Sequence, residues 1–131
     1  MSLISVIIYL VLAICLLPYL FTFIAKLGGG FEVRDNQNPR AFLAKTTGFA
    51  ARANAVQQNS FESLPFFLAG VLMALYMLVP DALTVRLCAA YLVLRILYGF
   101  AYLCNWSTFR SIIWFLSMLC PALLMLFAAR L

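Results

Sequence analysis

The stretch LISVIIYLVLAICLLPYLFTFIA, residues 3–25, runs for 23 residues without a charged side chain. The hydrocarbon core of a bilayer is about 30 Å thick, and a helix needs about 20 apolar residues to cross it. The segment lacks a basic leading region and is longer than the apolar part of a typical signal peptide. We therefore expect a retained membrane-spanning helix, which sets the class of the fold.

The rest of the chain has the same character. The 131 residues are 66% hydrophobic and 10% charged, whereas soluble domains carry about 25% charged residues. Further apolar runs cover residues 63–80, 87–109 and 111–129. The sequence thus predicts an all-α integral membrane four-helix bundle in a single domain, residues 1–131, with helices at about 3–26, 47–79, 82–105 and 109–130.

One substantial loop, at about residues 27–46, is predicted from its glycines, its charges and its Asn-Pro pair. Arg86 and Arg130 are the only basic residues on the opposite side of the membrane. The positive-inside rule places the loop in the cytoplasm and both termini on the other side. The basic residues around the loop are Lys26, Arg34, Arg40, Lys45 and Arg52.

The remaining composition bears on partners and metals. The net charge of +5 is spread along the chain, so membrane orientation explains it better than a nucleic-acid partner does. The chain has no histidine and no CxxC pair, which argues against a metal site or a disulfide framework. We interpret its four cysteines as packing residues. Cys104, near a predicted helix end, is the one to test for reactivity.

The stretch ARANAVQQNSFESLPFF, residues 51–67, gathers polar side chains in this apolar chain. At 100° per residue, Arg52, Asn59 and Glu62 fall within an arc of about 80°. On the next helix, Arg95, Tyr98 and Tyr102 share a face in the same way. A charge near the bilayer centre costs at least about 2.5 to 3.5 kcal/mol, so it normally faces the bundle and has a partner. Glu62 and Arg95 are predicted to be partners.

Two interpretations of these polar residues remain open. The Glu62 and Arg95 pair could simply join two helices, with Asn59 adding a hydrogen bond between them. However, the donors at the cytoplasmic end exceed what one carboxylate can accept, and arginine suits the recognition of an anionic ligand. Lipid head groups are the alternative partner for those donors. The donors in question are Arg52, Asn54, Gln57, Gln58 and Arg110.

Three segments resemble the membrane-associated proteins in eicosanoid and glutathione metabolism, the MAPEG family. RANAVQQNSFESLPFF (52–67) is similar to the family pattern RAxxxxxNxxExxPxF, and RILYGFAY (95–102) is similar to RxxYxxxY. Arg110 and Ser111 fall where a basic residue opens the fourth helix of the family. The loop DNQNPR (35–40) resembles that of the small bacterial members, which implies a location in a bacterial inner membrane.

The resemblance implies a left-handed four-helix bundle assembled as a homotrimer, with glutathione sites between neighbouring subunits near the cytoplasmic face. The implied activity is that of a glutathione-dependent transferase or peroxidase. Its substrates would be hydrophobic electrophiles or lipid hydroperoxides that enter from the bilayer. Glutathione would be the co-substrate, and membrane lipids would surround the trimer.

The resemblance also implies roles for individual residues. Arg110 would stabilise the glutathione thiolate, with Ser111 beside it, and Glu62 would take the ammonium group. The chain departs from the eukaryotic enzymes at Ala55, where they carry a second arginine. The alternative function is that of a non-catalytic lipid-binding or scaffold protein of the same fold. Two further possibilities are an enzyme that uses a different thiol cofactor and a transport protein. The residues expected to hold glutathione are Arg52, Asn59, Glu62, Arg95, Tyr98 and Tyr102.

Overall fold

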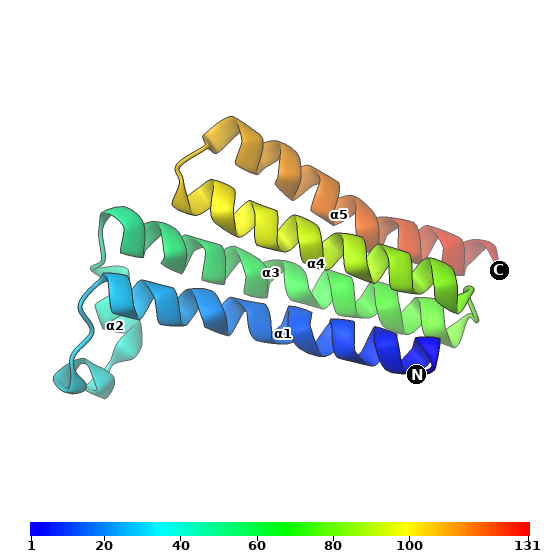
Figure 1. Ribbon diagram of the computed structural model, residues 1–131, viewed down its shortest axis with the longest axis horizontal. Helices are drawn as coiled ribbons and strands as arrows, with labels where there is room; N and C mark the ends of the chain where they lie inside the picture. The colour runs from blue at the N-terminus through cyan, green and yellow to red at the C-terminus, as the bar shows by residue number, and fades with distance from the viewer.

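Four long helices, each antiparallel to the one before it, form the body of the computed structural model, which describes residues 1–131 (Figure 1). The prediction of an all-α fold is confirmed, but the chain has five α-helices, because a short one lies in the segment predicted as a loop. The elements are α1 (Leu3–Gly28), the 3-10 helix η1 (Val33–Gln37), α2 (Pro39–Ala44), α3 (Gly48–Tyr76), α4 (Asp81–Leu103) and α5 (Ser107–Arg130).

Local capping explains the added helix and the end of α3. The Asn38 side chain accepts a hydrogen bond from the Ala41 N–H, and Pro39 occupies the first turn, which together start α2. α3 ends at Tyr76, three residues before the predicted end. Leu78 there adopts a positive φ of 58°, and the Val79 N–H returns to a carbonyl of the last turn, which closes the helix.

Three helices, α1, α4 and α5, are long and apolar enough to cross a membrane. The polar first half of α3 keeps it outside that group, although with 29 residues it is the longest helix. α3 packs against all three of the others, so it is an integral part of the bundle. At 1.5 Å per residue it is about 43 Å long, which exceeds the thickness of about 30 Å of a hydrocarbon core.

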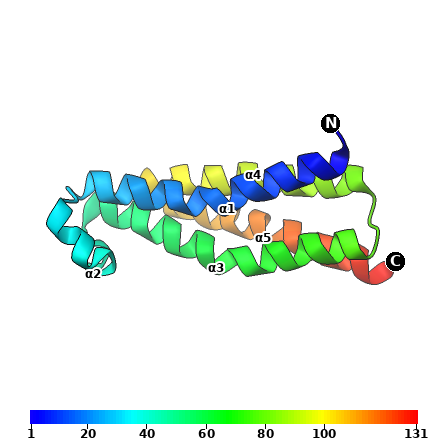
Figure 2. The same ribbon diagram turned by 90° about the horizontal axis from the view of Figure 1, so that it is seen from below.

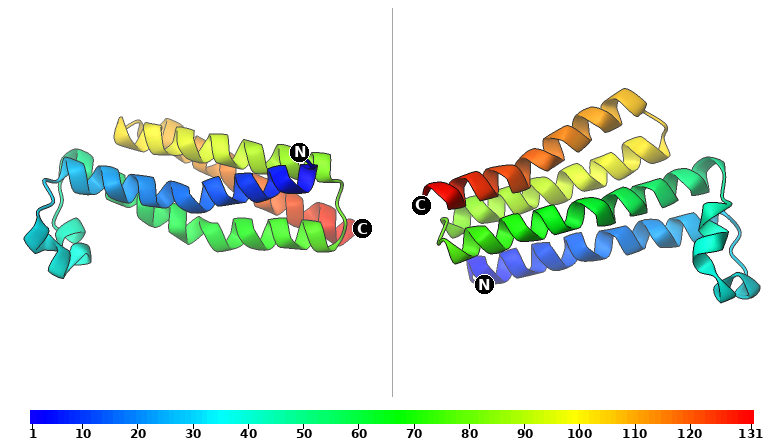
Figure 3. Two further views of the ribbon diagram at one scale, coloured as in Figure 1. Left: turned by 60° about the horizontal axis from the view of Figure 1, so that its bottom comes forward. Right: turned by 180° about the vertical axis from the view of Figure 1, so that it is seen from behind.

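The long helices form two layers. α1 and α4 lie in one layer and α3 and α5 in the other (Figure 2). Both termini and the turn between α3 and α4 lie at one end, which we call the termini end. The connection with η1 and α2, together with the turn between α4 and α5, forms the opposite end, which we call the loop end (Figure 3).

Three apolar clusters form the core. The largest fills the termini half and the second the loop half, and the third, made of Ala25, Leu43 and Ala53, joins α2 to α1 and α3 at the loop end.

Two glycines let the long helices approach closely. A Cβ added at Gly99 would lie 2.1 Å from the Phe21 ring, so any other residue there would displace the Phe21 side chain from between α1 and α4. A Cβ added at Gly70 would lie 3.0 Å from the Pro121 carbonyl oxygen, which brings α3 and α5 together in the same way.

Candidate functional site

A polar layer centred on Arg95 lies between the apolar cluster of the termini half and the two clusters of the loop half. Arg95 is only 2% exposed, and its Nη2 donates to Asn59 Oδ1 at 2.7 Å and to Ser60 Oγ at 3.2 Å. Its Nη1 donates to Ser117 Oγ at 3.5 Å, and the guanidinium carbon lies 4.3 Å from the centre of the Tyr98 ring. This one side chain therefore links α3, α4 and α5 in the middle of the bundle.

The prediction that Glu62 pairs with Arg95 is wrong. Glu62 is exposed on the surface of α3, and the one ion pair in the structure joins Arg34 to Glu32. Three residues separate Asn59 from Glu62, which turns the carboxylate about 60° away from the amide around the helix. The amide oxygen therefore accepts the bond from Arg95, and the guanidinium keeps its charge among uncharged acceptors.

A cavity of about 280 Å³, which we call the site cavity, lies between α3, α4 and α5 toward the loop end. Five of the eight predicted site residues meet around it. Arg95 lies one layer deeper, bonded to the amide that forms part of the cavity wall. The wall consists of Asn59, Tyr98, Tyr102, Arg110, Ser111 and Trp114.

Arg110 is the cation of the site cavity. It belongs to the first turns of α5, it is half-buried, and its guanidinium carbon lies 4.5 Å from the centre of the Tyr102 ring. Tyr102 in turn packs edge to face on Tyr98, with ring centres 5.8 Å apart. No carboxylate pairs with Arg110. A guanidinium stacked on a ring, without a counter-ion and near the positive end of a helix dipole, is suited to bind an anion.

Arg52 and Glu62 lie outside the site cavity. The Nε of Arg52 donates to the carbonyl oxygen of Leu103 at 3.2 Å, so this side chain caps the end of α4. Glu62 lines a separate, larger cavity of about 580 Å³, which we call the outer cavity, between α2 and the outer face of α3. The other polar residues of that outer cavity are Arg40, Asn54, Gln57 and Gln58.

An apolar groove adjoins the site cavity on α5. Its volume is about 530 Å³, and it begins at the polar first turn of the helix and continues over apolar side chains. Arg110 and Ser111 belong to both the groove and the site cavity. Arg110 therefore lies between a polar cavity and an apolar surface. The groove is lined by Ser107, Thr108, Arg110, Ser111, Ile112, Phe115 and Leu116.

Three residues of the site escaped the sequence reasoning. Trp114 lines the site cavity, and Ser117 contacts Arg95. Both could have been found from spacing, because Arg110, Trp114 and Ser117 are four and three residues apart and share one face of α5. Ser60 also contacts Arg95. Spacing could not have indicated it, because Ser60 directly follows Asn59 and adjacent residues do not lie on the same face of a helix.

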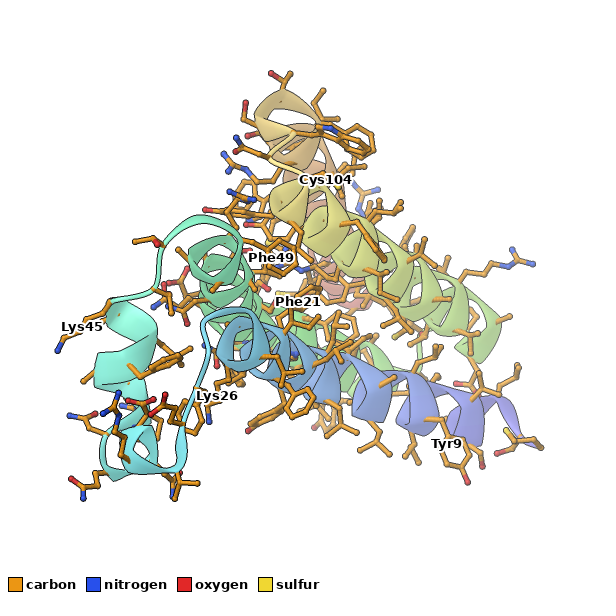
Figure 4. All side chains as sticks on the ribbon, turned by 60° about the vertical axis from the view of Figure 1, so that its left-hand side comes forward. Tyr9, Phe21, Lys26, Lys45, Phe49 and Cys104 are labelled. Carbon is orange, nitrogen blue, oxygen red and sulfur yellow. The ribbon has the colours of Figure 1, made fainter.

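The cysteines lie apart from the polar layer. All four are free, Cys88 and Cys120 are buried, and Cys15 is half-buried. Cys104 is the only exposed thiol; it lies at the end of α4 (Figure 4). The loop end therefore carries the one thiol that a water-soluble reagent can reach.

A family model described as the MAPEG family matches residues 6–130, which is nearly the whole chain. The match includes all four long helices, the site cavity and the groove. Searches of the curated proteins and of the solved structures returned no match.

Proposed function

The chain belongs to the MAPEG family, and on that premise we propose that it is a membrane-bound glutathione-dependent transferase or peroxidase. Its substrates would be hydrophobic electrophiles or lipid hydroperoxides. The observation that carries this proposal is the position of Arg110, between the tyrosine-lined site cavity and the apolar groove. An anionic sulfur at Arg110 and an apolar acceptor in the groove would be in contact there.

The chemistry assigned to Arg110 is electrostatic. A thiol attacks as its thiolate, and a guanidinium beside the sulfur lowers the pKa of the glutathione thiol, whose proton leaves to water. In conjugation, the sulfur forms a bond to the electrophilic carbon, and the leaving group departs with its electron pair. In peroxide reduction, the sulfur takes the terminal oxygen and the lipid alkoxide takes a proton. The resulting sulfenic acid condenses with a second glutathione to give the disulfide and water.

We propose that a second subunit completes the site, within a homotrimer. Typical ligand pockets have volumes of about 300 to 1,000 Å³. The site cavity, with a volume of about 280 Å³, is smaller than these pockets. Glu62 lies about 21 Å along α3 from its start at Gly48 and is exposed, and in lipid such a charge would cost about 2.5 to 3.5 kcal/mol. If the outer face of α3 covers the site cavity of a neighbouring subunit, the ligand site becomes larger and Glu62 is no longer exposed to lipid. Glu62 would then bind the ammonium group of glutathione.

Mixing two inactive variants tests the shared site. Arg110→Ala should remove turnover, and Glu62→Gln should remove it at low glutathione concentration, because each variant lacks one half of the site. In randomly mixed trimers a wild-type Arg110 meets a wild-type Glu62 at some interfaces. We expect recovery of about a quarter of the wild-type rate, from the statistics of a cyclic trimer. The assay is conjugation of a chlorodinitrobenzene by purified protein co-expressed from two tagged genes.

Two controls keep the mixing experiment specific. Trimers mixed only after purification, without subunit exchange, should stay inactive. Co-expression of Arg110→Ala with Ser111→Ala, two changes on the same side of the site, should give no wild-type site at any interface. A mixture of Arg110→Ala and Glu62→Gln that remains inactive despite proven mixed trimers would place the whole site within one chain.

The orientation of the protein follows from the basic loop end, and we propose that this end faces the cytoplasm. Because Cys104 is the only exposed thiol, a membrane-impermeant maleimide should label inverted inner-membrane vesicles but not intact spheroplasts. The Cys104→Ser variant should remove the signal. A cysteine introduced at exposed Ser2, in the Cys104→Ser background, should give the opposite pattern. Labelling of Cys104 in spheroplasts would reverse the assigned topology.

One observation favours the second candidate, a non-catalytic lipid-binding or scaffold protein. The donor Nε of Arg52 is engaged by the Leu103 carbonyl, and Ala55 offers no donor at all. α3 therefore supplies fewer free guanidinium groups for glutathione than the same helix of the eukaryotic enzymes, which carries an arginine at the position of Ala55. Glutathione binding separates the two candidates directly, because a scaffold needs no thiolate.

A further inference from the structure

A second polar cavity lies at the loop end, apart from the site cavity. It measures about 520 Å³ and is enclosed by the end of α1, η1, α2 and the residues that lead into α3. We call it the loop-end cavity. It shares no residue with the site cavity or the groove. Its polar side chains are Arg34, Asp35, Gln37, Asn38, Lys45, Thr46 and Thr47.

The charges around the loop-end cavity favour an anion. Residues 26–46 hold four cations against two carboxylates, and both carboxylates are engaged. Glu32 pairs with Arg34 at 2.9 Å, and Asp35 Oδ2 accepts the Glu32 N–H at 2.8 Å, which closes the turn of η1. Lys45 is exposed and pairs with neither. An exposed ion pair contributes at most about 1 kcal/mol, so Arg34 can turn from Glu32 to a stronger anion.

The position of the cavity places that anion at the membrane surface. η1 and α2 project sideways from the end of α1 instead of covering the bundle end (Figures 1 and 4). Lys26, at the last turn of α1, lies 4.7 Å from the centre of the Phe31 ring, and Phe31 packs edge to face on Phe42, which lines the cavity. Lys26 directly follows the 23-residue uncharged run of α1, so it marks the level at which this helix leaves the hydrocarbon core and reaches the lipid head groups. The cavity thus lies beside the bundle at that level.

We propose that the loop-end cavity binds the phosphate group of an anionic phospholipid. Lys45 and Arg34 would pair with the phosphate oxygens, and the hydroxyl group of Thr47, which makes no hydrogen bond within the chain, would donate to them. Asp35 also lines the loop-end cavity, and its carboxylate would repel a second negative charge on the ligand. The cavity would therefore prefer a phosphodiester, which carries one negative charge, to a phosphate group that carries two. The lipid would hold α2 against the membrane beside the entrance to the outer cavity, which Arg40 of α2 also lines.

The test measures lipid affinity of the full-length protein in detergent by native mass spectrometry. The probes are dioleoylphosphatidylglycerol, dioleoylphosphatidylcholine and inorganic phosphate. A basic side chain near an anionic lipid contributes about a factor of five, so Lys45→Gln should raise the Kd for phosphatidylglycerol about fivefold. The double variant with Arg34→Gln should raise it about 25-fold. Glu32→Gln should lower the Kd, since it frees Arg34.

Arg86→Gln is the matched control, because it removes one exposed cation at the termini end. Its Kd should equal that of the wild type. All the altered side chains are exposed, so the variants are expected to fold. Equal weakening by Arg86→Gln, or no weakening by the double variant, would overturn the site. Inorganic phosphate that binds as tightly as phosphatidylglycerol, or phosphatidylcholine that does so, would overturn the anionic lipid as its ligand.

Discussion

Arg110→Ala is expected to lower the rate of glutathione conjugation by about 10²-fold to 10³-fold, the usual effect of removing one donor that stabilises a developing anion. The guanidinium is stacked on Tyr102 and lacks a carboxylate partner, so little of the fold depends on its charge. Trimer formation and thermal stability should therefore change little. Steady-state kinetics at saturating glutathione, with gel filtration of the same sample, measure both quantities.

Two further variants make the Arg110 result interpretable. Arg110→Lys keeps a cation but loses the planar fork, so it should retain part of the activity. Lys45→Ala removes an exposed cation at the same end of the bundle but outside both the site cavity and the outer cavity, and it should leave the rate at saturating glutathione unchanged. Conjugation that survives Arg110→Ala would exclude Arg110 from thiolate stabilisation, whatever the activity of the protein.

Arg95→Ala is expected to destabilise the protein by about 3 to 5 kcal/mol, the usual cost of truncating a large buried side chain to alanine. The substitution leaves the acceptors on Asn59, Ser60 and Ser117 without their donor, and it opens a cavity in the middle of the bundle. Unfolding of the detergent-solubilised protein, followed by circular dichroism, measures the loss. Because Asn59 also lines the site cavity, glutathione affinity should fall as well.

The matched control for Arg95 is Tyr91→Phe, one turn earlier on α4. The Tyr91 hydroxyl and Ser63 Oγ are 3.0 Å apart, and loss of this single hydrogen bond should cost about 1 kcal/mol. Arg95→Lys should be intermediate, since an ammonium cannot reach acceptors on both α3 and α5. If Arg95→Ala proved no more costly than Tyr91→Phe, the polar layer would not be what joins the three helices.

The long helices could be predicted from the sequence because α1, α4 and α5 each carry an apolar run as long as a bilayer requires, and α3 carries a shorter one in its second half. The short α2 was missed, although its signals are present: Asn38 is a capping residue and Pro39 favours a first turn. Six residues are too few to show a helical period, and the Asn-Pro pair is equally typical of a turn. The early end of α3 depends on the positive φ of Leu78, which no side-chain pattern indicates.

The site could be predicted in part. Spacing placed Tyr98 and Tyr102 on one face, and the structure brings them to the site cavity. Spacing could not say where the buried face of α3 ends, because that depends on how α4 and α5 pack against it. Asn59 falls inside this boundary and Glu62 outside it, which is why the predicted ion pair does not form. Arg52 reaches the end of a neighbouring helix, and no local pattern encodes that contact.

The central claim is that the site cavity binds glutathione and ionises its thiol at Arg110. Ultraviolet difference spectroscopy of the detergent-purified protein, titrated with glutathione at neutral pH, tests this most directly, because free glutathione is mostly protonated there. The account predicts a saturable thiolate absorbance in the wild type and its loss in Arg110→Ala. No thiolate signal from the wild type, or the same signal from Arg110→Ala, would contradict it.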